Sequence, residues 1–314
     1  MDKIKIGTAA APGTCGELVQ GRIDGIDFLV TCPIDMWSKV SVFQSDDISD
    51  KGFKAIKERT EDGESASLAK VQRAISIASS NEYANLNQQS NSNQQANNQT
   101  LQYIHSSDLP TGKGMASSTA DIVAAYTATR RFFGVDPTAD ELANVAISIE
   151  PSDGIMYPGI TIFDHITGRW TEKLGEALNI SIVIIDPGGT VDTIAFNNRR
   201  KLKQLNDKKE TQVKKALKLI KEGVIEKDSE KLGAGATISA WANQEILPKP
   251  QLQQIVDIGK YWNALGVNVA HSGTVMGIFF EQGVHCEQEI AEYIRKKNAN
   301  WRVYTTKMIS GGVR

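Results

Sequence analysis

The chain has 314 residues and 40% of them are hydrophobic, which is enough for a sizeable core in one large or two smaller domains. Its 35 Lys and Arg residues are balanced by 37 Asp and Glu residues, and no basic run is interleaved with aromatics, which argues against nucleic acid as a partner. No segment reaches the ~18 apolar residues that span a bilayer.

The three cysteines, Cys15, Cys32 and Cys286, are too few and too scattered for a disulfide framework or a zinc motif. The first ten residues lack the apolar core of a signal peptide. We therefore expect a reduced, cytoplasmic protein that binds neither nucleic acid nor membrane, and a homodimer remains open.

The first third of the chain is predicted to contain short strands separated by turns. Alternating or β-rich segments predict strands at Lys3–Thr8, Phe28–Cys32 and Lys39–Phe43. Glycine and proline predict turns between them, at Pro12-Gly13, Gly21, Gly25 and Pro33.

A helix is predicted over Ser65–Ser80, because Leu68, Val71 and Ile75 recur at helical spacing. The next segment, Asn81–Gln99, consists mainly of Asn, Gln and Ser and cannot bury apolar surface. We predict that it is a disordered surface insertion.

Regular elements resume at Leu101–His105, an alternating segment that predicts a strand. A helix should follow over Ala116–Phe133 and stop at Gly134, and another over Asp140–Ile149 with Thr138 as N-cap. The second half predicts an α+β sandwich. Its strands are expected at Ile180–Asp186, Val267–Ala270, Gly277–Phe280 and Trp301–Thr305, and its helices at Glu210–Glu222, Ser229–Trp241, Pro250–Leu265 and Glu287–Lys296.

The segment Leu109–Ala120 has the composition of a phosphate-binding loop that leads into a helix. Gly112 and Gly114 allow the backbone to turn its amides inward, and the N-terminus of the following helix favours an anion. Lys113 adds positive charge, and three hydroxyls at Ser117–Thr119 can meet a phosphate or Mg²⁺. The segment lacks the Walker A order, and a simple glycine turn before a Ser-rich helix start remains an alternative.

Two further features favour the phosphate interpretation. Glu150 follows the next predicted helix and can complete the ligand shell of Mg²⁺. The second glycine- and hydroxyl-bearing loop, Ser272-Gly273-Thr274, lies between two predicted strands and can close over the phosphates.

Taken in chain order, the glycine-rich motifs resemble those of the GHMP kinases. That family is named for galactokinase, homoserine kinase, mevalonate kinase and phosphomevalonate kinase. The central loop resembles Leu109–Ala120, with Lys113, Met115 and Ala116 as departures, and the flanking motifs resemble Ala11–Thr14 and Ala270–Thr274. Within the family the likeness is closest to the L-threonine kinases of cobalamin biosynthesis. It rests on Ala11–Gly21, Cys32–Asp35, Gly112–Ser118, Glu150–Asp153 and Phe163–His165.

The resemblance implies a two-domain α+β fold. Residues 1–175 would form an ATP-binding domain similar to ribosomal protein S5 domain 2, and residues 176–314 a ferredoxin-like domain. It also implies ATP and Mg²⁺, with Ser118 and Glu150 as metal ligands, and transfer to the side-chain hydroxyl of free L-threonine for the corrin nucleotide loop. The nucleotide would contact Pro110, Thr111, Gly112, Lys113, Gly114, Met115, Ala116, Ser117, Ser118 and Thr119.

Phosphoryl transfer depends mainly on positioning and charge stabilisation, so we expect Lys113, Ser118, Glu150 and Asp153 to be catalytic. Asp153 is the candidate base, although a turn residue after Pro151 fits it equally, and Asp164 and His165 also fit structural roles. Glu17 or Asp35 can meet a substrate ammonium, and Gln20 or a backbone amide its carboxylate. The predicted substrate residues are Gly13, Thr14, Cys15, Glu17, Gln20, Asp35, Ser272, Gly273 and Thr274. Another alcohol such as homoserine, or a sensor without catalysis, remain alternatives.

Overall fold

The computed structural model describes residues 5–44, 54–57, 64–89, 101–189, 191, 201–284 and 286–314. Its strands are β1 (Ile6–Ile23), β2 (Ile26–Gln44), β3 (Lys54–Lys57), β4 (Leu101–Ser107), β5 (Ile160–Phe163), β6 (Thr171–Gly175), β7 (Ile180–Asp186), β8 (Gly266–Val269), β9 (Met276–Glu281) and β10 (Arg302–Lys307). Its helices are α1 (Glu64–Gln89), α2 (Ser117–Phe132), α3 (Ala139–Ile149), α5 (Leu202–Lys208), α6 (Glu210–Glu226), α7 (Ser229–Ala242), η1 (Asn243–Glu245), α8 (Leu252–Tyr261) and α9 (Glu287–Lys297).

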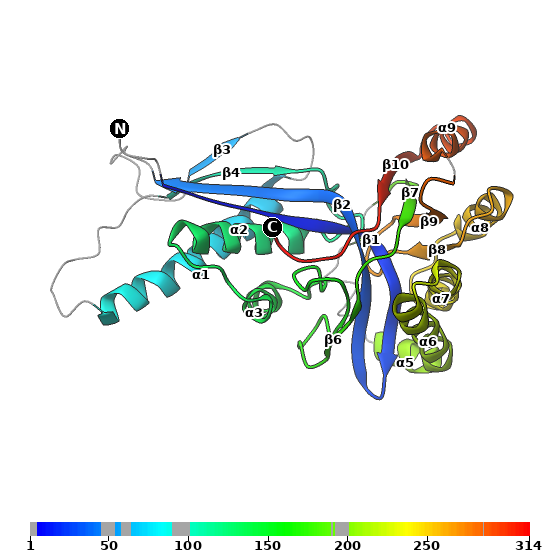
Figure 1. Ribbon diagram of the computed structural model, residues 1–314, viewed down its shortest axis with the longest axis horizontal. Coiled ribbons are helices and arrows are strands. Elements are labelled where there is room, and N and C mark those ends of the chain that lie inside the picture. The colour runs from blue at the N-terminus through cyan, green and yellow to red at the C-terminus, as the bar shows by residue number, and fades with distance from the viewer. Residues whose placement is uncertain are drawn as a thin grey trace.

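Within the described residues the strands form one 10-stranded sheet in the order β10-β7-β9-β8-β1-β2-β4-β3, with β5 paired to β2 and β6 paired to β5. Helices α1, α2 and α3 lie along the first part of the sheet, and α5 to α9 surround the second part (Figure 1). Strand β1 meets β8 where Glu17 pairs with Val269, so the two parts join at that residue.

The first two strands are much longer than predicted. β1 and β2 pair as one antiparallel hairpin, and only Gly25 of the predicted turn residues lies in its turn. The turns predicted at Pro12-Gly13, Gly21 and Pro33 are wrong. β1 shifts register between Pro12 and Gly13 and again after Thr14, the residue opposite Pro33. Bulges of this kind let proline and glycine stay inside a strand.

Helix α1 is also longer than predicted. It runs to Gln89, so the disordered segment expected over Asn81–Gln99 is wrong for residues 81–89. Once a helix has nucleated, each further residue adds a hydrogen bond at little extra entropy, which lets a polar sequence extend it. The remainder of that prediction, residues 90–99, lies outside the described residues.

The predictions around the central loop are confirmed. The strand at Leu101, the helix α2 and the helix α3 all form within a few residues of the expected bounds. The Thr138 side chain accepts a hydrogen bond from the Glu141 amide and caps α3, and Gly134 adopts φ +89° just after α2.

The second half has the predicted ferredoxin-like order, in which a split β-α-β-β-α-β unit places its strands as β10-β7-β9-β8. Helix α8 ends at Tyr261, before the expected Leu265. The predicted domain boundary after residue 175 falls between β6 and β7, and the division into two domains stays a prediction. The chain then returns to the first half, where Arg314 exchanges backbone hydrogen bonds with Ala10 at 2.8 Å. No helix of the described residues is long and apolar enough to cross a membrane.

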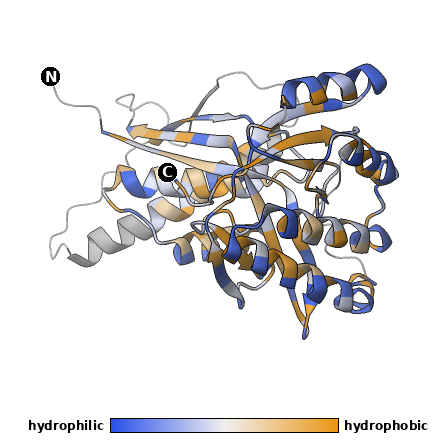
Figure 2. Cartoon of the chain, turned by 45° about the vertical axis from the view of Figure 1, so that its right-hand side comes forward, coloured by the Kyte–Doolittle hydropathy of each residue, from blue (hydrophilic) through white to orange (hydrophobic). Residues whose placement is uncertain are grey.

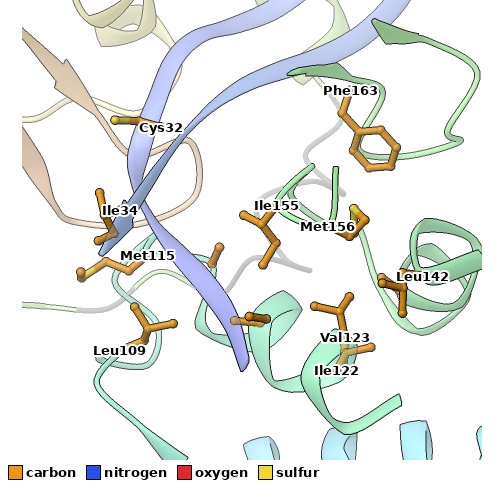
Figure 3. Close-up of a cluster of buried hydrophobic side chains, with 14 of the residues drawn as sticks. Cys32, Ile34, Leu109, Met115, Ile122, Val123, Leu142, Ile155, Met156 and Phe163 are labelled. Atoms are coloured by element: carbon orange, nitrogen blue, oxygen red, sulfur yellow. The ribbon is translucent and has the colours of Figure 1, made fainter. Parts of the chain in front are cut away.

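The core lies between the sheet and its helices. Hydrophobic residues run along the central strands while the outer helix faces are largely hydrophilic (Figure 2). The larger buried cluster includes Leu109 and Met115, which flank the central loop, together with Ile34 of β2 and Ile122 of α2 (Figure 3). Apolar side chains on both sides of the loop therefore anchor it in the core.

Candidate functional site

The predicted phosphate loop connects β4 to α2 and has an unusual backbone. Gly112, Gly114 and Ala116 all adopt left-handed conformations, with φ of +69°, +80° and +55°. Ala116 is the N-cap of α2 and offers no side-chain hydrogen bond to the first turn. The first amides of a 16-residue helix therefore remain available to an anion, which the helix dipole also favours.

Three consecutive carbonyls of the loop hold it against the rest of the protein. The Lys113 carbonyl accepts from the amides of Thr274 and Val275 at 2.9 and 3.1 Å, and the Met115 carbonyl accepts from Thr14 at 3.0 Å. Gly114 accepts from Gly16 at 3.3 Å. Because the C=O and N–H of a trans peptide unit point in opposite directions, the next three amides point away from these contacts. This arrangement produces a row of outward-facing donors.

The three glycine motifs lie next to one another in space. A Cβ atom at Gly114 would lie 2.3 Å from Ala270 Cβ, and one at Gly273 would lie 2.1 Å from the Lys113 carbonyl oxygen. A Cβ atom at Gly13 would lie 2.2 Å from Leu109 Cδ2. A side chain at any of these positions would therefore require its neighbours to move.

Lys113 lies in the loop but is bonded on its far side. Its Nζ is 2.9 Å from Asp186 Oδ2 and donates to the Gly189 carbonyl at 2.6 Å. Asp186 is buried at the end of β7 and also accepts from the Thr274 hydroxyl at 2.9 Å. Lys113 and Thr274 therefore fix the loop to the second half of the chain.

Ser118 and Glu150, the predicted metal ligands, are in direct contact. The Ser118 hydroxyl donates to Glu150 Oε1, and Glu150 is only 8% exposed at the end of α3. Together they present hydroxyl and carboxylate oxygens, which are the ligands that Mg²⁺ prefers. The described residues hold no cluster of three His, Cys, Asp or Glu suited to a metal. A metal here would therefore complete its shell with phosphate or water oxygens.

Lys70 of α1 also contacts these two residues, although it was not among the predicted site residues. Its Nζ lies 2.7 Å from Ser118 Oγ and 2.8 Å from Glu150 Oε2. The available signal was weak: Lys70 precedes the buried Ala74 and Ala78 by four and eight residues, so it lies on the apolar face of the helix. A charged residue on that face needs a partner, and Glu150 is that partner.

A pocket of about 340 Å³, partly open to solvent, adjoins the loop where the two halves meet. Strands β1 and β2, the loop, the segment after α3 and the loop after β8 all contribute to its wall. The lining consists of Glu17, Leu29, Gly114, Pro151, Ser152, Asp153, His165, His271 and Ser272.

Two carboxyls lie in the pocket lining. Glu17 is buried and Asp153 is partly buried; burial first, and then the neighbouring carboxylate of Asp153, raise the pKa of Glu17 well above its ordinary value. Burial raises the pKa of Asp153 to about 6. Thr119 fixes Asp153, since its hydroxyl accepts from the Asp153 amide at 3.2 Å. Two carboxyls of this kind share a proton or bind a cation.

The lining also contains two histidines. The rings of His165 and His271 meet edge to face, with centroids 5.1 Å apart. Burial lowers the pKa of His165 to about 4 and that of His271 well below its usual value, so both are neutral at pH 7. Gln20 holds His271: its Oε1 is 2.9 Å from His271 Nδ1, and its Nε2 donates to the Val269 carbonyl at 3.1 Å.

Several predicted substrate residues lie outside the pocket lining. Gln20 lies behind His271 with both ends of its amide bonded. Cys15 is buried against Asn268, and burial raises the pKa of its thiol. Asp35 is exposed and accepts from Trp37 Nε1 at 2.7 Å. Asp164 has a structural role, because its carboxylate accepts from the amides of Ile166 and Thr167.

The chain is similar to known kinases over nearly its whole length. The sequence profile for the GHMP kinases N terminal domain matches residues 81–160. The L-threonine kinase of Salmonella typhimurium is 30% identical over 98% of this chain and 95% of its own length. The L-threonine kinase of Citrobacter freundii is 28% identical over 97% and 98%.

Solved structures show the fold. The homoserine kinase of Cytophaga hutchinsonii superposes with a TM-score of 0.73 at 18% identity, covering 100% of this chain and 98% of that protein. The mevalonate kinase of Methanococcus jannaschii gives 0.67 at 16% identity, covering 98% of both chains. The predicted fold class is therefore confirmed.

Proposed function

Because the chain belongs to the GHMP kinase family of small-molecule kinases, we propose that it transfers the γ-phosphoryl group of ATP to the side-chain hydroxyl of free L-threonine. The observation that carries this proposal is the pocket beside Gly114, whose lining includes the carboxyls of Glu17 and Asp153 next to the phosphate loop. The full-length similarity to two L-threonine kinases supports the choice of acceptor. The product, O-phospho-L-threonine, would serve the nucleotide-loop linker of cobalamin.

The loop would bind the phosphates of ATP through backbone amides and the N-terminus of α2. Phosphoryl transfer passes through a loose, anionic transition state, so preorganised donors supply most of the protein's contribution. The left-handed residues Gly112, Gly114 and Ala116 turn those donors outward before any ligand arrives. Lys113 would add positive charge while its ion pair with Asp186 keeps the loop in place.

Ser118 and Glu150 would hold Mg²⁺, since their oxygens already converge and Glu150 is nearly buried. The metal would neutralise phosphate charge and orient the phosphoryl group. Lys70 contacts the Ser118 hydroxyl and the second carboxylate oxygen of Glu150, Oε2, and would keep that carboxylate oriented. We infer that Lys70 balances the buried carboxylate when nucleotide is absent.

Asp153 is the proposed base. Its partly buried carboxyl lies beside Thr119, next to the metal pair, and its pKa of about 6 leaves it ionised but more basic than an ordinary aspartate at pH 7. Glu17 would share its proton with Asp153 in the empty pocket and attract the substrate ammonium when L-threonine binds. Leu29, an apolar residue of the lining, is suited to contact the methyl group.

The test is ADP release and product formation with L-threonine, L-serine and L-homoserine in parallel. We expect L-threonine to give the highest kcat/KM. Rapid turnover of homoserine with only background rates on threonine would instead indicate that homoserine is the acceptor, as the name of the structurally similar homoserine kinase suggests. Binding of ATP without turnover of any alcohol would indicate a sensor.

A further inference from the structure

The two histidines of the pocket lining, His165 and His271, include a buried polar atom that lacks a partner. His165 is 4% exposed, and its Nδ1 has no hydrogen-bond partner among the described residues. Buried polar atoms are nearly always paired in folded proteins, and an exception in a pocket wall indicates a place where a ligand supplies the partner. Ser272 adds a hydroxyl to the same lining.

Lys249 brings a positive charge close to these histidines. It is 6% exposed and its Nζ donates to the carbonyl of Gly273, the residue after Ser272. A carbonyl carries no net charge, and no ion pair within the described ranges involves Lys249. A buried ammonium without a carboxylate is strongly destabilising, so it is usually retained for an anionic ligand.

The charge of Lys249 acts on the pocket itself. It is one of the cationic groups that lower the pKa of His271, which shows that its field reaches the lining. The second such lysine, Lys209, donates to Asn243 at 3.1 Å and feels the carboxylates of Asp27 and Glu245. Burial alone lowers the pKa of Lys249, to about 8, with no acidic group opposing it. The positive charge of Lys249 is therefore less balanced by nearby carboxylates than that of Lys209.

We propose that the part of the pocket lining formed by His165, His271 and Ser272, backed by Lys249, binds the carboxylate of an α-amino-acid substrate. The carboxyls of Glu17 and Asp153 in the same lining then receive the ammonium. A pocket that combines these carboxyls with a nearby lysine suits a zwitterion and disfavours simple alcohols or hydroxy acids. This inference rests on the proposed function and names the group that selects amino acids.

The experiment compares Lys249→Met with wild-type enzyme on L-threonine and on L-threoninamide, whose carboxylate is replaced by a neutral amide. The KM for L-threonine should rise about 10- to 100-fold, the range for a hydrogen bond to a charged group. The KM for L-threoninamide should change by less than about twofold, because the lost charge has no partner there. Lys218→Met, at an exposed lysine of α6 whose side chain is 76% accessible, is the matched control and should match wild type.

Three outcomes would overturn the inference. The first is an unchanged KM for L-threonine in Lys249→Met. The second is an equal rise in KM for both amino-acid substrates. The third is a rise in the KM for ATP alone, which would indicate that Lys249 interacts with the phosphates of ATP and not with the acceptor. If Lys249→Met does not fold, His165→Phe tests the same carboxylate site. The KM for L-threonine should then rise about fivefold, and the KM for L-threoninamide should not. If wild type phosphorylates no amino acid, the proposed function fails, and calorimetry with L-threonine and L-threoninamide still tests the subsite.

Discussion

Replacing Gly273 by alanine tests whether direct contact between the two loops positions the phosphate site. Ordinary van der Waals contact begins near 3.4 Å, and the new Cβ would lie 2.1 Å from both the carbonyl oxygen of Lys113 and the amide nitrogen of Gly114. The overlap, 3.4 minus 2.1, is about 1.3 Å, and it falls on backbone atoms that cannot rotate away. Gly273 has no left-handed φ, so steric overlap is the whole perturbation.

A shift of about 1 Å in a reacting group reduces turnover by about 100-fold, so we expect kcat/KM for ATP to fall by about that factor in Gly273→Ala. Overpacking should also lower the free energy of unfolding by about 1–3 kcal/mol, which urea denaturation would measure. The control is Gly259→Ala in α8, where the nearest atom to the new Cβ is Ala264 Cβ at 3.3 Å. A folded Gly273→Ala enzyme with wild-type kcat and ATP affinity would refute the reasoning.

Three further predictions concern the metal pair, its lysine and the base. Ser118→Ala and Glu150→Ala should each lower kcat by about 100-fold or more with little change in thermal midpoint, and wild-type rates across a Mg²⁺ titration would refute the ligand assignment. Lys70→Met leaves the Glu150 carboxylate buried without its ion pair, so the free energy of unfolding without nucleotide should fall by about 1–3 kcal/mol. Adding Glu150→Ala should recover part of that loss. Because the raised pKa keeps Asp153 protonated up to about pH 6, kcat/KM should fall as pH decreases through that value. The Asp153→Asn variant should lack this inflection.

Local sequence pattern predicted the elements that depend on local chemistry. The loop at Gly112 and Gly114, the helix that follows it and the cap at Thr138 are set by residues within a few positions of each other. The buried strand β7 was recognisable because its seven residues are almost all apolar and β-branched. Local sequence therefore sufficed to predict the loop between β4 and α2, whose binding of phosphate stays a proposal.

The errors occurred where tertiary pairing overrides local preference. Pro33 reads as a turn residue, yet it continues β2 because β1 bulges opposite it at Thr14. Lys70 lies 48 residues before Ser118 in sequence, and Lys249 lies 24 residues before Gly273. No local pattern connects such pairs, because folding of the whole sheet brings them together.

The acidic groups at the pocket come from the first half of the chain, and the positive charge beside it comes from the second half. Glu17 and Asp153 come from the first half, and His271, Ser272 and the nearby Lys249 come from the second. Within the described residues, β1 pairs with β8 at Glu17 and Val269, so Glu17 lies where the two parts of the sheet join. The contact between Gly114 and Gly273 also joins the two halves, beside the phosphate loop. A ligand with opposite charges at its two ends would therefore contact both halves of the chain, and its binding would be coupled to the position of the phosphate loop.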